Sequence, residues 1–240
     1  MTEVVLAKGV IQRLAKDVRE ITRNPLIEHG IHYVHNTDNI LKGQALCVGS
    51  KGTPYENGYY LFEFEFPPNY PHAPPLVTYH TNDGKTRFNP NYYRNGKVCL
   101  SILNTWSGDQ WSSCNTISSI LLALCTVLND KPLLNEPGIK EDNKDFVTYN
   151  KIITFANLSV AIGDMLEKNY VKVKFPELRK IMVDHFKENY NSIMEQVYRN
   201  VGDHDSIATT RLYGMTMWLD YSNVGVRLTK IYEGFVKELL

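Results

Sequence analysis

Long apolar runs are missing from this chain of 240 residues. Its most apolar stretch, residues 117–128, is interrupted by serine and threonine and is shorter than the roughly 20 apolar residues that a membrane-spanning helix needs. The first residues are charged and amphipathic, without the apolar core of a signal peptide. We therefore expect a soluble protein with no membrane partner, located in the cytoplasm, the nucleus or both.

Neither sign of charge dominates the sequence. The chain has 26 Lys+Arg and 26 Asp+Glu, and the balance holds within residues 1–50 (6 basic, 5 acidic), 51–137 (6 and 7) and 138–240 (14 and 14). Binding to a phosphate backbone depends on a concentrated positive field. Because no part of the sequence supplies one, nucleic acid is not an expected partner.

Cysteine is scarce as well. The four cysteines, Cys47, Cys99, Cys114 and Cys125, are separated by 52, 15 and 11 positions. No two of them form the C-x-x-C pair of a zinc ribbon or a thioredoxin-like site, and four in 240 residues do not make a disulfide scaffold. We expect free thiols and no metal site.

The hydrophobic periodicity of the sequence predicts helices and strands, which together indicate an α+β fold. Residues 10–21 repeat apolar side chains at spacings of three and four, and Asn24-Pro25 should end this helix. Residues 60–66 alternate strictly, as a half-buried antiparallel strand does. The other expected elements are strands over 44–50 and 76–81, a helix capped by Asn115 or Thr116 that runs to 129, and helices over 142–168, 176–200 and 222–239.

A long irregular segment, residues 86–112, follows five prolines within residues 67–75. Irregular stretches of this length inside a compact domain are usually functional. Cys99 lies in the middle of the segment next to polar turn-forming residues, whereas Cys47 and Cys125 lie in apolar elements and fit a packed core. Cys99 is therefore the candidate nucleophile. The closest upstream histidine has no recognisable motif around it, so a Cys-His hydrolase has little support in the sequence.

A series of motifs brackets Cys99. It consists of Tyr-Glu-Asn-Gly-Tyr at 55–59, Phe-Pro-Pro-Asn-Tyr-Pro-His-Ala-Pro-Pro at 66–75, Phe-Asn-Pro-Asn at 88–91, Asn-Gly-Lys-Val-Cys-Leu-Ser-Ile-Leu at 95–103 and Trp-Ser at 111–112. In order and spacing the series closely resembles the ubiquitin-conjugating enzymes, from about residue 11 to about residue 168. The resemblance implies a UBC-like α+β core over 1–168, built on a four-stranded antiparallel meander flanked by helices, and a C-terminal helical extension over 169–240.

The resemblance also implies an activity. Cys99 would accept ubiquitin, or a ubiquitin-like protein, from an activating enzyme as a thioester and pass it to a substrate lysine or to a ligase. ATP is used by the activating enzyme, so no cofactor is expected on this chain. By position, Asn91 would donate an amide hydrogen bond to the oxyanion, Asn89 replaces a histidine that supports the loop, and Glu136, with Asn135 as the alternative, would orient the incoming lysine.

Further positions match the family's binding surfaces. Leu122 falls where the helix after the irregular segment meets the apolar patch of ubiquitin. Arg13 and Lys16 match the helix face that meets the activating enzyme. Each of these residues also has an ordinary explanation, as a core side chain or as part of a solvated helix face.

The ligase-facing loops depart from the common pattern of the family. His72 replaces a usual phenylalanine, and Ser113 and Cys114 replace Pro-Ala after Trp111 and Ser112. The segment between Cys99 and its tryptophan is also longer than usual. These changes put the docking of ordinary RING or HECT ligases in question.

The motifs around the cysteine and the helical tail are most similar to the large Z-type subgroup of the family. This similarity implies charging by the alternative ubiquitin-activating enzyme and the capacity to carry a second ubiquitin-like modifier. Two other functions stay open on the residues alone. One is a non-catalytic ubiquitin-binding module on the same fold, against which the presence of Cys99 argues, and the other is a cysteine protease.

Overall fold

The computed structural model describes residues 6–167, 172–203 and 206–237. The main helices and strands are α1 (Lys8–Arg23), β1 (Ile31–His35), β2 (Lys42–Val48), β3 (Tyr59–Glu65), β4 (Leu76–Tyr79), α2 (Ile117–Thr126), α3 (Phe146–Ala156), α4 (Pro176–Arg199), β5 (Ser206–Thr210), β6 (Met215–Leu219) and α5 (Tyr221–Lys237). The short helical segments are η1 (Ile27–His29), η2 (Ser101–Leu103), η3 (Pro132–Asn135), the π-helical η4 (Asn157–Asp164) that continues α3, η6 (Val201–Asp203) and η7 (Leu212–Gly214). None of the helices in these ranges is both long and apolar enough to cross a bilayer.

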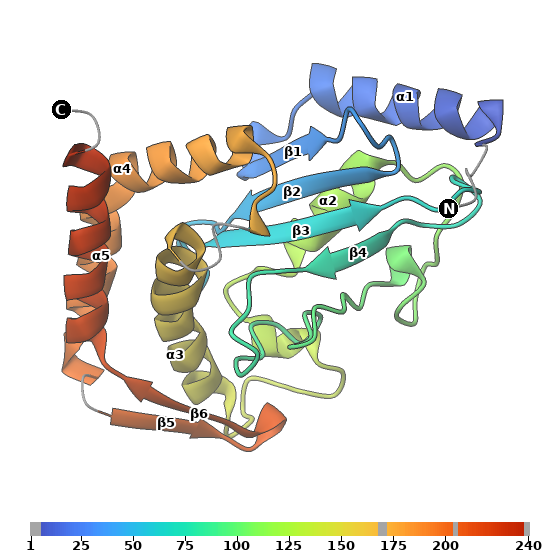
Figure 1. Cartoon of the computed structure of the whole chain (residues 1–240). Coiled ribbons are helices and arrows are strands. Elements are labelled where there is room, and N and C mark those ends of the chain that lie inside the picture. The colour runs from blue at the N-terminus through green and yellow to red at the C-terminus, as the bar shows by residue number, and fades with distance from the viewer. Residues whose placement is uncertain (1–5, 168–171, 204–205, 238–240) are drawn as a thin grey trace.

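Strands β1 to β4 form one antiparallel meander in chain order (Figure 1). This confirms the sheet that the family resemblance implies. Periodicity alone missed β1, because histidine and tyrosine interrupt the apolar pattern of this five-residue strand. Helix α1 ends at Arg23 with Asn24 as its C-cap, and Thr116 caps α2 through a capping box with Ser119, both as predicted.

One face of the sheet carries an aromatic core. Phe62 pairs with Tyr79 across β3 and β4, and its ring lies 5.2 Å from the ring of Tyr92, which belongs to the irregular segment. The rings of Tyr79 and Tyr92 stack at 4.9 Å. All three side chains are buried. This packing attaches the candidate active-site loop to the sheet.

The opposite face of the sheet is covered too, so the prediction of a half-buried strand over 60–66 was wrong for its first half. Leu61 points away from the aromatic core and is fully buried. The chain that leads into α4 covers this face: the buried Gln44 side chain donates to the Lys172 carbonyl (3.0 Å) and accepts from the Lys174 amide (2.9 Å). Only Glu63 and Glu65, farther along the strand, reach solvent.

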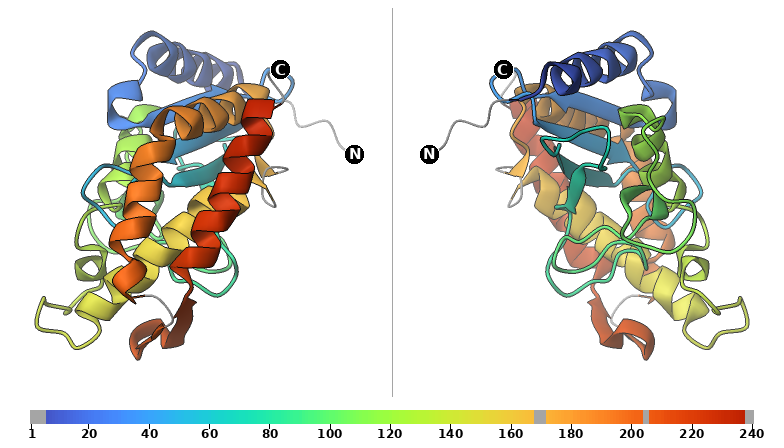
Figure 2. Two further views of the ribbon diagram at one scale, coloured as in Figure 1. Left: turned by 90° about the vertical axis from the view of Figure 1, so that its left-hand side faces the viewer. Right: turned by 90° about the vertical axis from the view of Figure 1, so that its right-hand side faces the viewer.

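The C-terminal extension packs on the core and on itself. Figure 2 shows α4 and α5 side by side, and the rings of Tyr190 and Tyr232 stack between them at 4.0 Å. The Arg227 guanidinium of α5 donates to the Ser159 carbonyl (2.9 Å) and to the Asp164 carboxylate (2.7 Å), so it anchors α5 to η4. The extension is therefore held by both apolar and charged contacts.

The extension also contains an element that the sequence analysis missed. Strands β5 and β6 form an antiparallel hairpin, where only helices were expected. The two five-residue strands contain β-branched residues, among them Ile207 and Thr209, and Gly214 lies in the turn between them with a positive φ. This signal is weak in a single sequence, because β-propensity depends on what the strand packs against. Here β5 lies against α3.

The burial of His185, where α4 docks beside Tyr59, makes this docking sensitive to pH. The two side chains are hydrogen-bonded (Tyr59 Oη to His185 Nδ1, 3.1 Å), and burial lowers the pKa of His185. A histidine whose pKa is lower in the folded than in the unfolded state stabilises the fold at pH values above its unfolded pKa of about 6.5. This stabilisation is lost as the pH falls from there through the folded-state pKa. We expect the unfolding free energy to decrease between about pH 7.5 and about pH 5.5, and to decrease less in His185→Gln, as measured by denaturant unfolding. The exposed His72→Gln is the control and should keep the wild-type decrease; an undiminished decrease in His185→Gln would contradict the prediction.

Candidate active site

Cys99 and Asn91 are joined by two reciprocal hydrogen bonds. The backbone N–H of Cys99 donates to the Asn91 carbonyl (2.8 Å), and the side-chain Nδ2 of Asn91 donates to the Cys99 carbonyl (2.7 Å). The seven residues between them, 92–98, therefore form a closed loop. Cys99 is 2% exposed, so little of the residue contacts solvent in this conformation. Two sequence-predicted residues thus lie together in the structure.

Asn89 lies beneath this loop and is fully buried. Its Nδ2 donates to the Tyr55 hydroxyl (2.9 Å) and to the Val127 carbonyl (2.7 Å), and its Oδ1 accepts from the backbone N–H of Asn91 (2.9 Å). The side-chain nitrogen and oxygen of this asparagine, which replaces the family's histidine, therefore both have hydrogen-bond partners. It holds the loop against the end of α2, which agrees with the packing role expected for this position.

Asn135 joins the same network from η3. Its Nδ2 donates to the Val127 carbonyl (2.9 Å) and lies 3.3 Å from Asn89 Oδ1, and its own Oδ1 accepts from Asn129 (3.1 Å). Both polar atoms of its side chain are thus hydrogen-bonded inside the protein. The neighbouring Glu136 has a half-buried side chain, and its Oε2 accepts a hydrogen bond from the Tyr213 hydroxyl at 2.5 Å. In this network Oδ1 of Asn135 is occupied, whereas Oε1 of Glu136 is not. Of the two candidates, Glu136 is therefore the one with a side-chain oxygen available to orient a lysine.

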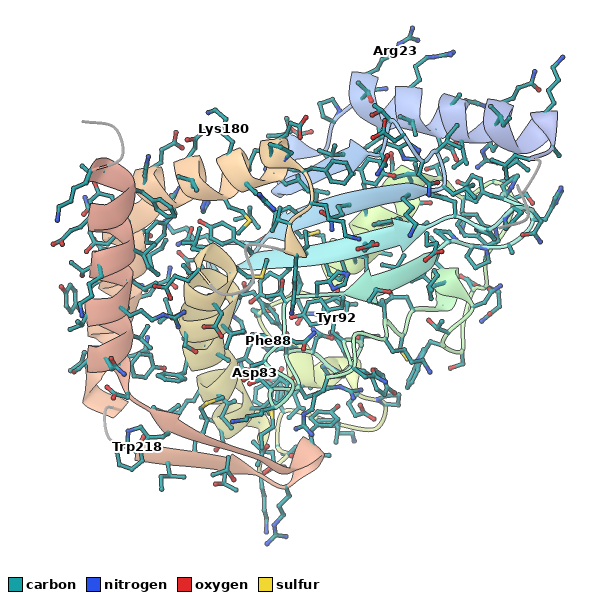
Figure 3. All side chains as sticks on the ribbon, in the orientation of Figure 1. Arg23, Asp83, Phe88, Tyr92, Lys180 and Trp218 are labelled. Atoms are coloured by element: carbon teal, nitrogen blue, oxygen red, sulfur yellow. The ribbon has the colours of Figure 1, made fainter. Side chains whose placement is uncertain are left out.

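Tyr213 lies at the tip of the β5–β6 hairpin and was not predicted as a site residue. Its carbonyl accepts from the Arg94 guanidinium (2.6 Å), and its ring lies 5.0 Å from the Arg87 guanidinium. Arg87 in turn donates to the carbonyls of Asn89 (3.1 Å) and Pro90 (2.8 Å). Figure 3 shows Phe88 and Tyr92 between the sheet and the hairpin, in the segment that the hairpin tip approaches. The motif series ended before the hairpin, so no signal in it pointed to Tyr213.

Comparison with known proteins identifies this arrangement. A family model described as "Ubiquitin-conjugating enzyme" matches residues 13–156, a span that includes Cys99 and its asparagine network. The chain belongs to the ubiquitin-conjugating enzyme family.

The relatives share a large part of the chain. "Ubiquitin-conjugating enzyme E2 Z" of Homo sapiens is 42% identical over 189 residues, which cover 77% of this chain and 52% of that protein. The protein of the same name from Danio rerio is 42% identical over 185 residues, covering 75% of this chain and 55% of that protein. The solved structure of human E2 G1 is 25% identical, covers 52% of this chain and 97% of its own, and superposes with a TM-score of 0.44. This chain spans about half the length of the curated E2 Z relatives.

The two loops that depart from the family's common pattern meet at the carbonyl of Pro71. Trp111 Nε1 donates to it at 2.7 Å and Ser113 Oγ at 3.2 Å. His72, the next residue after Pro71, is exposed, as is Ser113. The structure thus brings His72, Trp111 and Ser113 into one surface, although they come from loops about 40 residues apart.

The candidate residues of α1 have different environments. The Arg13 guanidinium donates to the carbonyls of Ser113 and Asn115 and pairs with Asp17, and its side chain is 18% exposed. Arg13 therefore links α1 to the loop of Ser113 and Asn115. Lys16, one turn away, is exposed.

Leu122 lies on α2 and is 40% exposed. It lines a cleft of about 830 Å³ that α2 shares with α4, where Cys125 and His185 also contribute. An apolar side chain open to solvent is compatible with the family's ubiquitin-binding position. No group of three or more His, Cys, Asp or Glu residues within the described ranges is placed to hold a metal ion.

The buried amide of Asn89 should be important for stability. Asn89→Ala leaves the Asn91 N–H and the Val127 carbonyl with fewer hydrogen-bond partners, and an unsatisfied buried group costs about 1–3 kcal/mol. We expect the unfolding free energy to fall by about that amount in denaturant unfolding. The exposed Asn69→Ala serves as control and should stay within about 0.5 kcal/mol of the wild type. Equal stability of the two variants would contradict the structural role of Asn89.

Proposed function

We propose that this chain conjugates ubiquitin, or a ubiquitin-like protein, through a thioester on Cys99. The observation that carries the proposal is the closed loop in which Asn91 and Cys99 bind each other, at the family's active-site motif. The alternative of a non-catalytic module does not account for the presence of a cysteine in this loop. The protease alternative has no support from the family.

The proposed reaction has two acyl transfers. The sulfur of Cys99 attacks the carbonyl carbon that links the modifier to the activating enzyme, the activating enzyme's thiol leaves, and the thiol proton of Cys99 is transferred to it. A substrate amine, or the thiol of a ligase, then attacks the new thioester and gives up a proton to solvent, and Cys99 leaves as a thiolate. The thioester divides one difficult transfer into two easier ones. ATP is consumed by the activating enzyme, so we propose no cofactor for this chain.

Asn91 is proposed to stabilise the oxyanion of each tetrahedral intermediate. A side-chain amide has two N–H donors, and one of them holds the Cys99 carbonyl, which leaves the second for the oxyanion. The Oδ1 atom of Asn91 is buried and has no hydrogen-bond partner among the described residues. Because Oδ1 accepts hydrogen bonds and cannot donate them, only the Nδ2 group of Asn91 can serve the oxyanion.

The proposed partners follow from the family and from the surfaces described above. They are the modifier at Leu122, the activating enzyme at the face of α1 that carries Lys16 and Arg13, and a ligase at His72, Trp111 and Ser113. We further propose that the activating enzyme is the alternative one, because this chain is similar to E2 Z proteins over about three quarters of its length. We propose a location in the cytoplasm, the nucleus or both.

Charging of Cys99 tests the function directly. Incubation with ubiquitin, an activating enzyme and ATP should give an adduct that reductant cleaves, seen as a mobility shift on gels with and without thiol. Cys99→Ala should give no adduct and Cys99→Ser a reductant-resistant ester, because an oxygen replaces the sulfur. Cys114→Ala, which removes an exposed thiol outside this loop, should charge like the wild type. Failure of the wild type with every activating enzyme tried would refute the proposal.

The choice of activating enzyme is tested separately. With the two ubiquitin-activating enzymes at equal concentration, initial charging rates should favour the alternative enzyme by at least about tenfold, which corresponds to a difference of about 1.4 kcal/mol in activation free energy. Equal loading by both enzymes would contradict this part of the proposal and leave the thioester chemistry unaffected.

A further inference from the structure

We infer that Tyr213, at the tip of the β5–β6 hairpin, is a positioning residue that holds the Glu136 carboxylate for the incoming amine. This inference rests on the proposed function, because it concerns the step in which the Cys99 thioester is transferred to lysine. It assigns to the C-terminal extension a part in the active site, besides its packing on the sheet.

The hairpin tip is held in place from several directions. Tyr213 has φ 62°, a left-handed conformation that is unfavourable for a residue with a side chain. The Arg94 guanidinium donates to its carbonyl at 2.6 Å, and the preceding Leu212 N–H donates to the Asp145 carboxylate at 2.7 Å. Thr210 Oγ1 donates to the Leu212 carbonyl at 2.8 Å. Strained backbone persists where surrounding contacts over-determine it, and such positions cluster at functional sites.

The ring of Tyr213 faces the support of the active-site loop. It lies 5.0 Å from the Arg87 guanidinium, which is 3.4 Å from the Tyr93 ring on another side. Arg87 donates to the carbonyls of Asn89 and Pro90, immediately before Asn91. The tyrosine ring therefore contacts the same arginine that holds the Asn89–Asn91 segment.

The hydroxyl of Tyr213 reaches the candidate acidic residue. It donates to Oε2 of Glu136 at 2.5 Å, a charge-assisted hydrogen bond. Glu136 follows Asn135, whose amide is bound to the network at Val127 and Asn89, so its backbone is anchored as well. A glutamate side chain without a partner samples several rotamers, whereas a carboxylate fixed at one oxygen presents the other in a constant direction. We therefore expect Oε1 to meet the ammonium or amine of the acceptor lysine.

A purely structural role for the hairpin would also require Tyr213, so the experiment must separate the hydroxyl from the ring. Tyr213→Phe keeps the ring beside Arg87 and the backbone carbonyl that Arg94 binds, and it removes only the hydrogen bond to Glu136. Glu136→Gln removes the charge that the hydroxyl holds. If the two groups act as a unit, the double variant should be no slower than Glu136→Gln alone.

The experiment uses the full chain, charged with ubiquitin on Cys99 and then separated from ATP. Single-turnover discharge to free lysine is followed for the wild type, Tyr213→Phe, Glu136→Gln and the double variant. We expect Tyr213→Phe to charge at the wild-type rate, to stay folded under the assay conditions, and to discharge about 3- to 10-fold more slowly, the loss expected for one hydrogen bond. Tyr198→Phe, an exposed tyrosine on α4, is the matched control and should discharge like the wild type.

Several results would overturn the role. Positioning through Glu136 would be excluded if Tyr213→Phe discharged at the wild-type rate. It would also be excluded if the effects of the two substitutions multiplied in the double variant, or if the wild type charged but its discharge did not depend on lysine. These outcomes differ from failure of the proposed function, in which the wild type forms no thioester at all.

Discussion

The buried side-chain amide of Asn89 is the contact on which the candidate active site depends. It connects the loop of Tyr55, the end of α2 at Val127, the segment of Asn91 and the amide of Asn135 in η3. Because an amide has two donors and an acceptor with two lone pairs, one small buried group can satisfy four partners. The loop of Cys99 is then closed onto this network by the two hydrogen bonds between Cys99 and Asn91.

The C-terminal extension belongs to the same physical unit as the core. Gln44, deep in the sheet, is satisfied by the backbone of residues 172 and 174, and Tyr59 is hydrogen-bonded to His185 of α4. Without these segments the Leu61 face of the sheet would be open to water. The extension then returns through the hairpin to the opposite end of the core, where Tyr213 meets Arg87, Arg94 and Glu136.

Regular elements were predictable where a local pattern was strong. Helix α1, the alternating strand β3 and the cap of α2 all follow from spacing and from side chains that act on their own turn of backbone. Strand β1 and the β5–β6 hairpin were not predicted, because strands of five residues with polar interruptions carry little information of their own. Their stability comes from neighbours: β1 pairs with β2, and β5 packs against α3.

Some contacts of the candidate site were likewise predictable from the sequence, and others were not. Cys99 and Asn91 are eight positions apart, so the motif in one continuous segment was enough to pair them. The environment of Glu136 depends on Tyr213, which lies 77 positions away. The burial of both faces of the sheet at β3 depends on segments more than 100 positions away. Short covalent spacing restricts the geometry that two residues can adopt, and a sequence pattern records that restriction. Contacts between distant segments depend on how whole helices and sheets pack, so only the tertiary structure decides which hairpin reaches the active site.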